Sequence, residues 1–304
     1  MNAPTTNSPW LEQRERGSRS ATRFMTWFAL RGGRRVASLL LYPICAYFVL
    51  FSPRMRRASR QYLALALGRR PRLTDLWRHY FTFATTVLDR VYFVDGRFAD
   101  FDIETRGLEL LRHTLAKGRG CLLLGAHLGS FELLRTLAIE DELSVNAVMY
   151  EENAANITEA MNAQLDPVIR KRIIVSGEFD TMLRIAECLS RGELVGMLGD
   201  RSAGSDKTVT CRFFGRDAVF PQGPLRLALC LRVPVYLVAG LYEGGKHYVI
   251  HLEPFCEEPS AERAEPTAWT REWAQRYAER LEHFCRLAPY NWFNFYDFWS
   301  GSPR

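Results

Sequence analysis

The chain has 304 residues, and 47% of them are hydrophobic, which is enough for one large domain, or a domain with an added terminal segment, to bury a substantial core. The formal net charge of +6 comes almost entirely from arginine and indicates an anionic partner such as phospholipid, nucleic acid or an acidic carrier protein. The sequence has no Cys/His zinc pattern, RNP-like motif or C-x-x-C pair, which argues against nucleic-acid binding and a disulfide framework, and its scattered cysteines indicate a reducing compartment.

The amino-terminal region begins with residues 1–20, whose Pro, Ser, Asn and Arg content is typical of a disordered tail. Two apolar blocks follow, Phe24–Leu30 and Val36–Phe51, separated by a short arginine- and glycine-rich stretch. The second block has sixteen residues and contains Pro43, so it is slightly shorter than the roughly 20 residues that span a bilayer. It also starts late and is followed by no small-residue cleavage site, so we do not expect a signal peptide.

Arginines lie on both sides of the second apolar block. Eleven arginines and one acidic residue fall between Arg14 and Arg60. Basic residues on both flanks favour a helix that lies in, or dips into, an anionic leaflet, and the alternative is a buried amino-terminal helix of the globular domain. We therefore expect a tail over 1–20, membrane-associated helices over 21–70 and an α/β domain over 71–304.

The rest of the chain alternates between helical and strand-like patterns. Apolar residues recur at helical spacing at first, and from about residue 100 short apolar runs alternate with amphipathic stretches. The expected strands are Phe101–Thr105, Cys121–Gly125, Val145–Tyr150, Ile173–Val175, Leu194–Leu198, Val209–Phe213, Val235–Leu241 and His247–Leu252. The expected helices are 54–67, 72–94, 107–116, 130–139, 153–164, 178–190, 222–231 and 262–287. This alternation predicts an α/β fold with a mostly parallel central sheet flanked by helices.

The segment Cys121–Glu132 carries the main functional signal. An apolar run ends in small residues, His127 follows at once, and Glu132 comes five positions later. On one continuous helix, five positions correspond to about 140° of rotation, so the two side chains meet only if the chain turns, which Gly125 and Gly129 permit. We expect a strand, a turn and a helix, with the imidazole as general base and the carboxylate fixing its tautomer. The alternative is a histidine that only caps the helix.

The start of the expected helix offers two further groups. Free amides at Gly129, Ser130 and Phe131 would stabilise an oxyanion. A serine near a histidine can act as a nucleophile, but Ser130 lies in no G-x-S-x-G elbow, so we expect it to be the N-cap. The other histidines are unclustered and form no H-E-x-x-H motif, so we expect no metal site.

A second block, Gly196–Gly204, places Asp200 at the end of an apolar run, the same strand-end position as His127. It is followed by Val209–Arg216 and by Phe220–Pro224. With the His-x4-Glu block, this order resembles the bacterial lipid A biosynthesis late acyltransferase family, within the wider lysophospholipid acyltransferase superfamily. The resemblance covers about residues 24–300 and includes Tyr150, the basic run Arg170-Lys171-Arg172 and the ending Asn291-Trp292-Phe293-Asn294-Phe295-Tyr296.

The resemblance implies transfer of a fatty acyl group from an acyl carrier protein or coenzyme A thioester to a lipid or glycolipid hydroxyl, without a cofactor. It implies His127 as the general base and Glu132 as its partner, in the HX4E motif. It also implies attachment to the bacterial inner membrane, with the active site on the cytoplasmic face. Two other readings remain: an acyl thioesterase using the same site, and a catalytically inert lipid-binding or scaffold protein.

The chain departs from the family pattern at three positions. Asp200 matches the acidic residue of the family's Asp-Gln pair, and Arg201 replaces the glutamine. Ser130 and Phe131 depart from the usual His-x-Gly-Asn-Trp-Glu. These changes leave the expected dyad intact and make the chain look more like a divergent branch of the family, so the acceptor lipid stays open.

Substrate contacts are expected around these blocks. An acyl groove would be shaped by apolar residues that otherwise form ordinary core: Phe131, Leu133, Leu134, Phe213 and Phe214. Phosphate groups of donor or acceptor would bind arginines that otherwise are solvated surface: Arg135, Arg170, Arg201 and Arg216. The full set of expected substrate-binding residues is Gly129, Ser130, Arg135, Tyr150, Arg170, Asp200, Arg201, Phe213 and Gly223. The aromatic stretch 290–299 either sits at the membrane interface or packs against the core.

Overall fold

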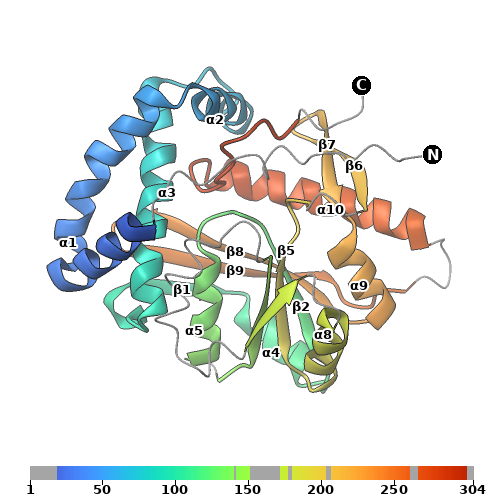
Figure 1. Ribbon diagram of the computed structural model, residues 1–304. Coiled ribbons are helices and arrows are strands. Elements are labelled where there is room, and N and C mark those ends of the chain that lie inside the picture. Colours follow the sequence, from blue (N-terminus) through green and yellow to red (C-terminus); the bar gives the residue numbers. More distant parts are fainter. Residues whose placement is uncertain are drawn as a thin grey trace.

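A central sheet organises the molecule (Figure 1). The computed structural model describes residues 19–139, 142–150, 172–176, 180–202, 207–260 and 266–299. The sheet has seven strands in the order β1-β9-β8-β2-β5-β3-β4, and all neighbours run parallel except the β8–β9 pair. The strands are β1 Asp102–Arg106, β2 Cys121–Gly125, β3 Val145–Tyr150, β4 Ile173–Ser176, β5 Leu194–Leu198, β8 Val235–Gly244 and β9 His247–Cys256. The expected α/β fold with a mostly parallel sheet is confirmed.

A separate two-stranded hairpin lies outside this sheet. It pairs β6 (Thr208–Phe213) with β7 (Arg216–Pro221) in antiparallel register. Its two-residue turn, Phe214-Gly215, has positive φ at both positions, 52° and 71°, which matches the twist of a tight hairpin. The sequence pattern predicts β6 but misses β7, because β7 begins with two charged residues and ends in proline.

The helices agree with the periodicity to within a few residues. They are α1 Arg19–Phe51, α2 Pro53–Ala66, α3 Leu73–Val94, α4 Leu108–Leu115, α5 Leu134–Ile139, α8 Thr181–Ser190, α9 Gly223–Leu231 and α10 Pro266–Leu287. Short 3-10 turns, η1 Phe98–Asp100 and η2 Phe131–Leu133, precede β1 and α5. The helix expected at 153–164 lies outside the described residues.

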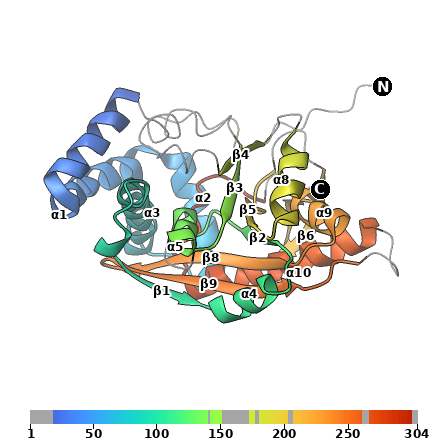
Figure 2. The ribbon, with the colours of Figure 1, turned by 90° about the horizontal axis from the view of Figure 1, so that it is seen from below.

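The alternation of β2 side chains divides the core between the two faces of the sheet. Cys121 and Leu123 belong to the cluster that contains residues of α1, α3, α4 and α5. Leu122 and Leu124 belong to the cluster that contains residues of α2, α8, α9 and α10. Figures 1 and 2 show α1, α2 and α3 gathered at one end of the molecule and α9, α10 and the hairpin at the other.

Helix α1 joins both amino-terminal apolar blocks across a kink at Gly33, where φ is 77° and ψ is 160°. Beyond the kink, buried residues recur every four positions, at Ala37, Leu41, Cys45 and Val49, and this face packs along α3. The stretch Met25–Phe51 is long and apolar enough to cross a membrane, a criterion that the core helix of a soluble protein or a signal sequence also meets.

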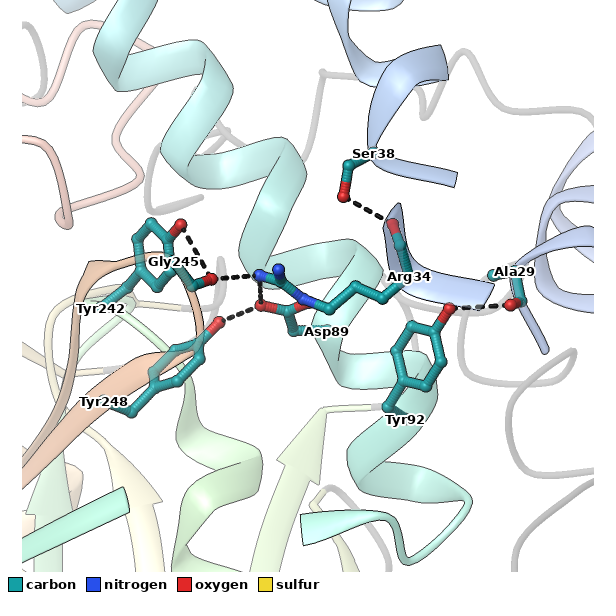
Figure 3. A network of polar contacts seen from close by, with 8 residues as sticks. All are labelled: Ala29, Arg34, Ser38, Asp89, Tyr92, Tyr242, Gly245 and Tyr248. Atoms are coloured by element: carbon teal, nitrogen blue, oxygen red, sulfur yellow. Dashed lines mark hydrogen bonds and ion pairs between the residues drawn. The ribbon is translucent and has the colours of Figure 1, made fainter. Parts of the chain in front are cut away.

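A buried polar network fastens the kink of α1 to the rest of the molecule (Figure 3). Arg34 donates to both carboxylate oxygens of Asp89 on α3, at 2.6 and 2.8 Å, and to the carbonyl of Gly245 at 2.6 Å. The Tyr248 hydroxyl donates to the same fully buried carboxylate at 2.7 Å. Burial raises the pKa of Asp89, while Arg34 and Tyr248 oppose that rise. Because removing Arg34 would leave the buried Asp89 carboxylate short of its charged partner, these bonds tie α1 to α3 and to the turn between β8 and β9.

Candidate active site

The site forms where β2 and β5 end side by side. The two strands are parallel, with Gly125 paired to Leu198, so the residues two positions beyond each, His127 and Asp200, meet at the same sheet edge. Nδ1 of His127 lies 2.7 Å from Oδ1 of Asp200, and the His127 main-chain amide donates to the same oxygen at 3.1 Å. A carboxylate only accepts, so Nδ1 carries the proton and Nε2 keeps a free lone pair. The His127 side chain is 35% exposed and that of Asp200 is fully buried, so the imidazole is the accessible partner.

The carboxyl-terminal segment closes the other side of the carboxylate. Nε1 of Trp292 donates to Oδ2 of Asp200 at 3.1 Å. The same segment is joined to the histidine loop, because the Gly129 amide donates to the Asn291 carbonyl at 2.8 Å and the Phe293 amide donates to the His127 carbonyl at 2.9 Å. Both oxygens of Asp200 are therefore bonded to protein groups.

The charges around this pair set its protonation. Burial alone would raise the pKa of Asp200. His127, Arg201 and the Trp292 N–H outweigh that effect and lower this pKa to about 2, so the carboxylate is ionised at neutral pH. Burial and the positive charge of Arg201 lower the pKa of His127, and they outweigh Asp200, which raises it. The imidazole is consequently neutral at pH 7, the state that a general base requires.

Arg201 lies beside the pair and faces the carboxyl-terminal segment. Its guanidinium donates to the Phe293 carbonyl at 2.8 Å and lies 5.4 Å from the ring centroid of Tyr296. Arg201 is one of the expected phosphate ligands, and both of these contacts join it to the carboxyl-terminal segment that contains Trp292.

Glu132 lies in the first turn after the loop, in η2, as expected, but its carboxylate contacts a different residue from the one predicted. Arg90 of α3 bonds Oε1 of Glu132 through Nε at 2.8 Å and Nη2 at 2.6 Å. Among the hydrogen bonds of the described residues, none joins Glu132 to His127. The contact expected of Glu132 is made by Asp200, because the turn at Gly129 directs η2 against α3.

The turn itself needs glycine at position 129. Gly129 has a φ of +66° and forms a bridge with Gly240 of β8, and a Cβ on Gly129 would overlap the Gly240 carbonyl oxygen. The Ser130 amide donates to that carbonyl at 2.8 Å. The amides of Gly129 and Ser130 are therefore occupied and do not form the expected oxyanion site. Ser130 is buried and stands at the N-cap position of η2, as expected, but its side chain makes no capping hydrogen bond there.

The expected acyl groove is divided between the two faces of the sheet. Leu133 and Leu134 are buried in the cluster with α3 and α5, whereas Phe213 and Phe214 are buried in the cluster with α9 and α10. Phe131 is partly buried against the first cluster. These five side chains do not line one common groove.

The remaining expected ligands are scattered. Phe213 is fully buried, with its ring centroid 5.4 Å from that of Trp292, and Gly223 starts α9 on the surface. Arg216 begins β7, with its guanidinium 6.0 Å from the Trp299 ring. Arg135 lies on α5 and Tyr150 ends β3, but their side chains, and all of Arg170, lie outside the described residues.

The aromatic ending packs against the core, which decides between its two expected locations. Trp292 is 1% exposed, and Phe293, Phe295 and Phe298 are buried as well. The residue that sequence reasoning missed is Trp292: the segment stood out by its aromatic content, but nothing local connects it to a carboxylate 92 positions away.

Comparison with protein families identifies the family of the chain. A family model described as "Bacterial lipid A biosynthesis acyltransferase" matches residues 24–300. No curated protein sequence matches the chain.

Proposed function

Because this chain belongs to the bacterial lipid A biosynthesis acyltransferase family, we propose that it transfers a fatty acyl group from an acyl thioester to a hydroxyl of a lipid or glycolipid. The observation that carries the proposal is the His127–Asp200 hydrogen bond, which leaves Nε2 of a partly exposed imidazole unprotonated just beyond the end of β2. A thioester is already activated, so a base next to the acceptor hydroxyl and an oxyanion site suffice for the reaction, with no covalent intermediate.

The chemistry follows from the tautomer. Nε2 of His127 takes the proton of the acceptor hydroxyl as its oxygen bonds to the thioester carbon, and Asp200 stabilises the resulting imidazolium. The carbon–sulfur bond then breaks, and the departing thiolate takes the proton from the imidazolium. In this proposal Asp200 takes the orienting role that the family motif gives to Glu132. Glu132 instead acts through its ion pair with Arg90, which holds η2 and the preceding loop against α3.

The second element of the proposal is attachment to an anionic membrane. The face of α1 opposite its contact with α3 exposes large apolar side chains, among them Leu39 at 65%, Leu50 at 64% and Phe51 at 63%. The adjoining α2 exposes Arg54, Arg57 and Arg60, which recur every three positions. An apolar helix face flanked by arginines matches a helix lying in the leaflet. Because the other face of α1 is buried against α3, we place α1 along the membrane surface, on the cytoplasmic face of the inner membrane.

The donor is an acyl carrier protein or coenzyme A thioester, and the net charge of +6 suits an acidic carrier. An acyl thioesterase is the first alternative. The His127 side chain is 35% exposed, so water can reach the same base and accept the acyl group in place of a lipid hydroxyl. The third reading is a lipid-binding protein without catalysis.

One assay separates the three. The full-length protein is incubated with a fatty acyl thioester labelled in the acyl chain and with vesicles made from a bacterial membrane lipid extract. Label recovered in lipid supports the transferase. Label recovered only as free fatty acid supports the thioesterase, and an unchanged thioester supports the inert binder.

A further inference from the structure

A second histidine lies in the same network but has no part in the reaction proposed above. His79 of α3 is completely buried, with Nε2 2.8 Å from the Trp292 carbonyl oxygen and Nδ1 2.7 Å from the hydroxyl of Ser59 on α2. A carbonyl oxygen only accepts, so Nε2 carries the proton and Nδ1 accepts from the Ser59 hydroxyl. Ser59 is also fully buried, so this Ser–His pair is closed to substrate.

Trp292 connects this pair to the candidate base. Its carbonyl accepts from His79, while its ring N–H donates to Oδ2 of Asp200, whose Oδ1 accepts from His127. The hydrogen bonds form one continuous series that runs from α2 to the end of β2: Ser59, His79, Trp292, Asp200 and His127.

We propose that Trp292 and His79 are positioning residues for the base: Trp292 fixes the rotation of the Asp200 carboxylate, and His79 fixes Trp292. The effect of these two residues on the reaction rests on the proposed function, whereas their coupling to the His127 ring does not.

Burial gives the series its effect. Asp200 is fully buried, so without the Trp292 N–H its Oδ2 would have no water to replace the lost donor. The carboxylate would then rotate toward other donors, and the His127 ring would lose its fixed orientation.

His79 controls Trp292 through the main chain and through packing. The bond to the carbonyl sets the peptide plane at Trp292, and the imidazole stacks on Phe295 with centroids 4.6 Å apart.

Tyr62 of α2 packs edge-on against the Trp292 ring at 4.8 Å and donates to the Pro289 carbonyl at 2.8 Å. The helix that carries the exposed arginines is thus in contact with the residue that orients the base.

The test removes one hydrogen-bond donor and keeps the shape of the ring system nearly unchanged. Trp292 in the full-length protein is replaced by β-(3-benzothienyl)alanine, in which sulfur takes the place of the N–H. We expect kcat to fall roughly tenfold to a hundredfold, the range for losing a hydrogen bond to a charged group, with KM for the thioester changed less than twofold. In ¹⁵N spectra, the pH titration of the His127 ring should shift. The same replacement at Trp273 of α10, outside the series, is the control.

A paired substitution tests His79. His79→Gln places an amide N–H near the position of Nε2, whereas His79→Met has similar bulk and no donor. We expect His79→Met to lower kcat and shift the His127 titration, and His79→Gln to restore both toward wild type.

The His127 titration is read from the resting protein, so it reports coupling even if the protein transfers no acyl group. An unchanged titration and an unchanged kcat in the Trp292 replacement would overturn the role of Trp292. Equal effects of His79→Met and His79→Gln would overturn that of His79.

Discussion

Oδ1 of Asp200 accepts two hydrogen bonds from His127, one from the ring Nδ1 at 2.7 Å and one from the main-chain amide at 3.1 Å. This pair of hydrogen bonds fixes the ring relative to its own backbone, so a ring flip would break the pairing. The carboxylate therefore sets both the tautomer of the base and the direction in which Nε2 points.

The Arg201 charge should set the pH at which the base becomes active. Because burial and Arg201 lower the pKa of His127, the transfer rate should fall only as pH drops through a value below the ordinary 6.5. Arg201→Gln removes one of these two causes, so the pKa of His127 should rise and the acid limb of kcat/KM should move to higher pH. Profiles between about pH 4.5 and 8 measure this. An acid limb that moves to lower pH, or not at all, would show that Arg201 does not influence the base.

Glu132 should matter less than His127. Glu132→Gln and Arg90→Gln each break the ion pair that holds η2 on α3, so each should reduce transfer, and the double variant should be little worse than either single one. Initial rates of the three variants measure this, with Glu257→Gln, an exposed site beyond β9, as the control. If Glu132→Gln is as inactive as His127→Ala, the carboxylate acts directly on the base, as the family motif implies.

The exposed face of α1 should bind anionic vesicles. Leu39→Gln and Leu50→Gln should each weaken binding roughly 5- to 30-fold, because each removes about 1–2 kcal/mol of apolar burial, while the unfolding temperature stays the same. Co-sedimentation with vesicles of mixed neutral and anionic lipid measures this. Leu183→Gln on α8, equally exposed at 61%, should have no effect. Equal weakening by all three substitutions would mean that binding is not localised to α1.

His79 should make the fold sensitive to mild acid. Burial lowers the pKa of His79 from 6.5 to about 4, so the unfolded chain takes up its proton first as pH falls. The contribution of neutral, buried His79 to the free energy of unfolding is therefore complete above about pH 6.5. It is lost between pH 6.5 and about pH 4, and the total loss is about 3 kcal/mol. The stabilisation by Asp200, whose pKa is lowered from 3.8 to about 2, is complete above about pH 4 and is lost only at more acidic pH, so it does not affect this range. Chemical unfolding of wild type and His79→Gln across this range measures the difference, and parallel pH dependence in both would contradict it.

The sequence predicts much of the frame because its signals are local. Cys121–Gly125 and Leu194–Leu198 are apolar runs ended by small or polar residues, and their bounds match β2 and β5. The same pattern places His127 and Asp200 just past strand ends. The sequence does not predict that these two strands are neighbours, because strand order depends on the whole sheet and not on any short stretch of residues.

The site partners depend on those long-range relationships. The expected turn after His127 and the family motif both favour Glu132 as its partner, but the bridge from Gly129 to Gly240 sends that carboxylate to Arg90. Trp292 comes from the far end of the chain. Both assignments depend on how distant segments pack, which periodicity cannot report.

The central claim is that Asp200 makes His127 the base. Its most direct test is the initial rate of acyl transfer by purified Asp200→Asn, with His127→Ala as the inactive reference and His283→Ala, exposed on α10, as the control. The Trp292 N–H should keep the asparagine oxygen on its own side, which turns the amide N–H₂ toward Nδ1 and stabilises the wrong tautomer. We predict a loss of roughly 10²–10⁴, close to that of His127→Ala. A rate for Asp200→Asn within threefold of wild type would contradict the account.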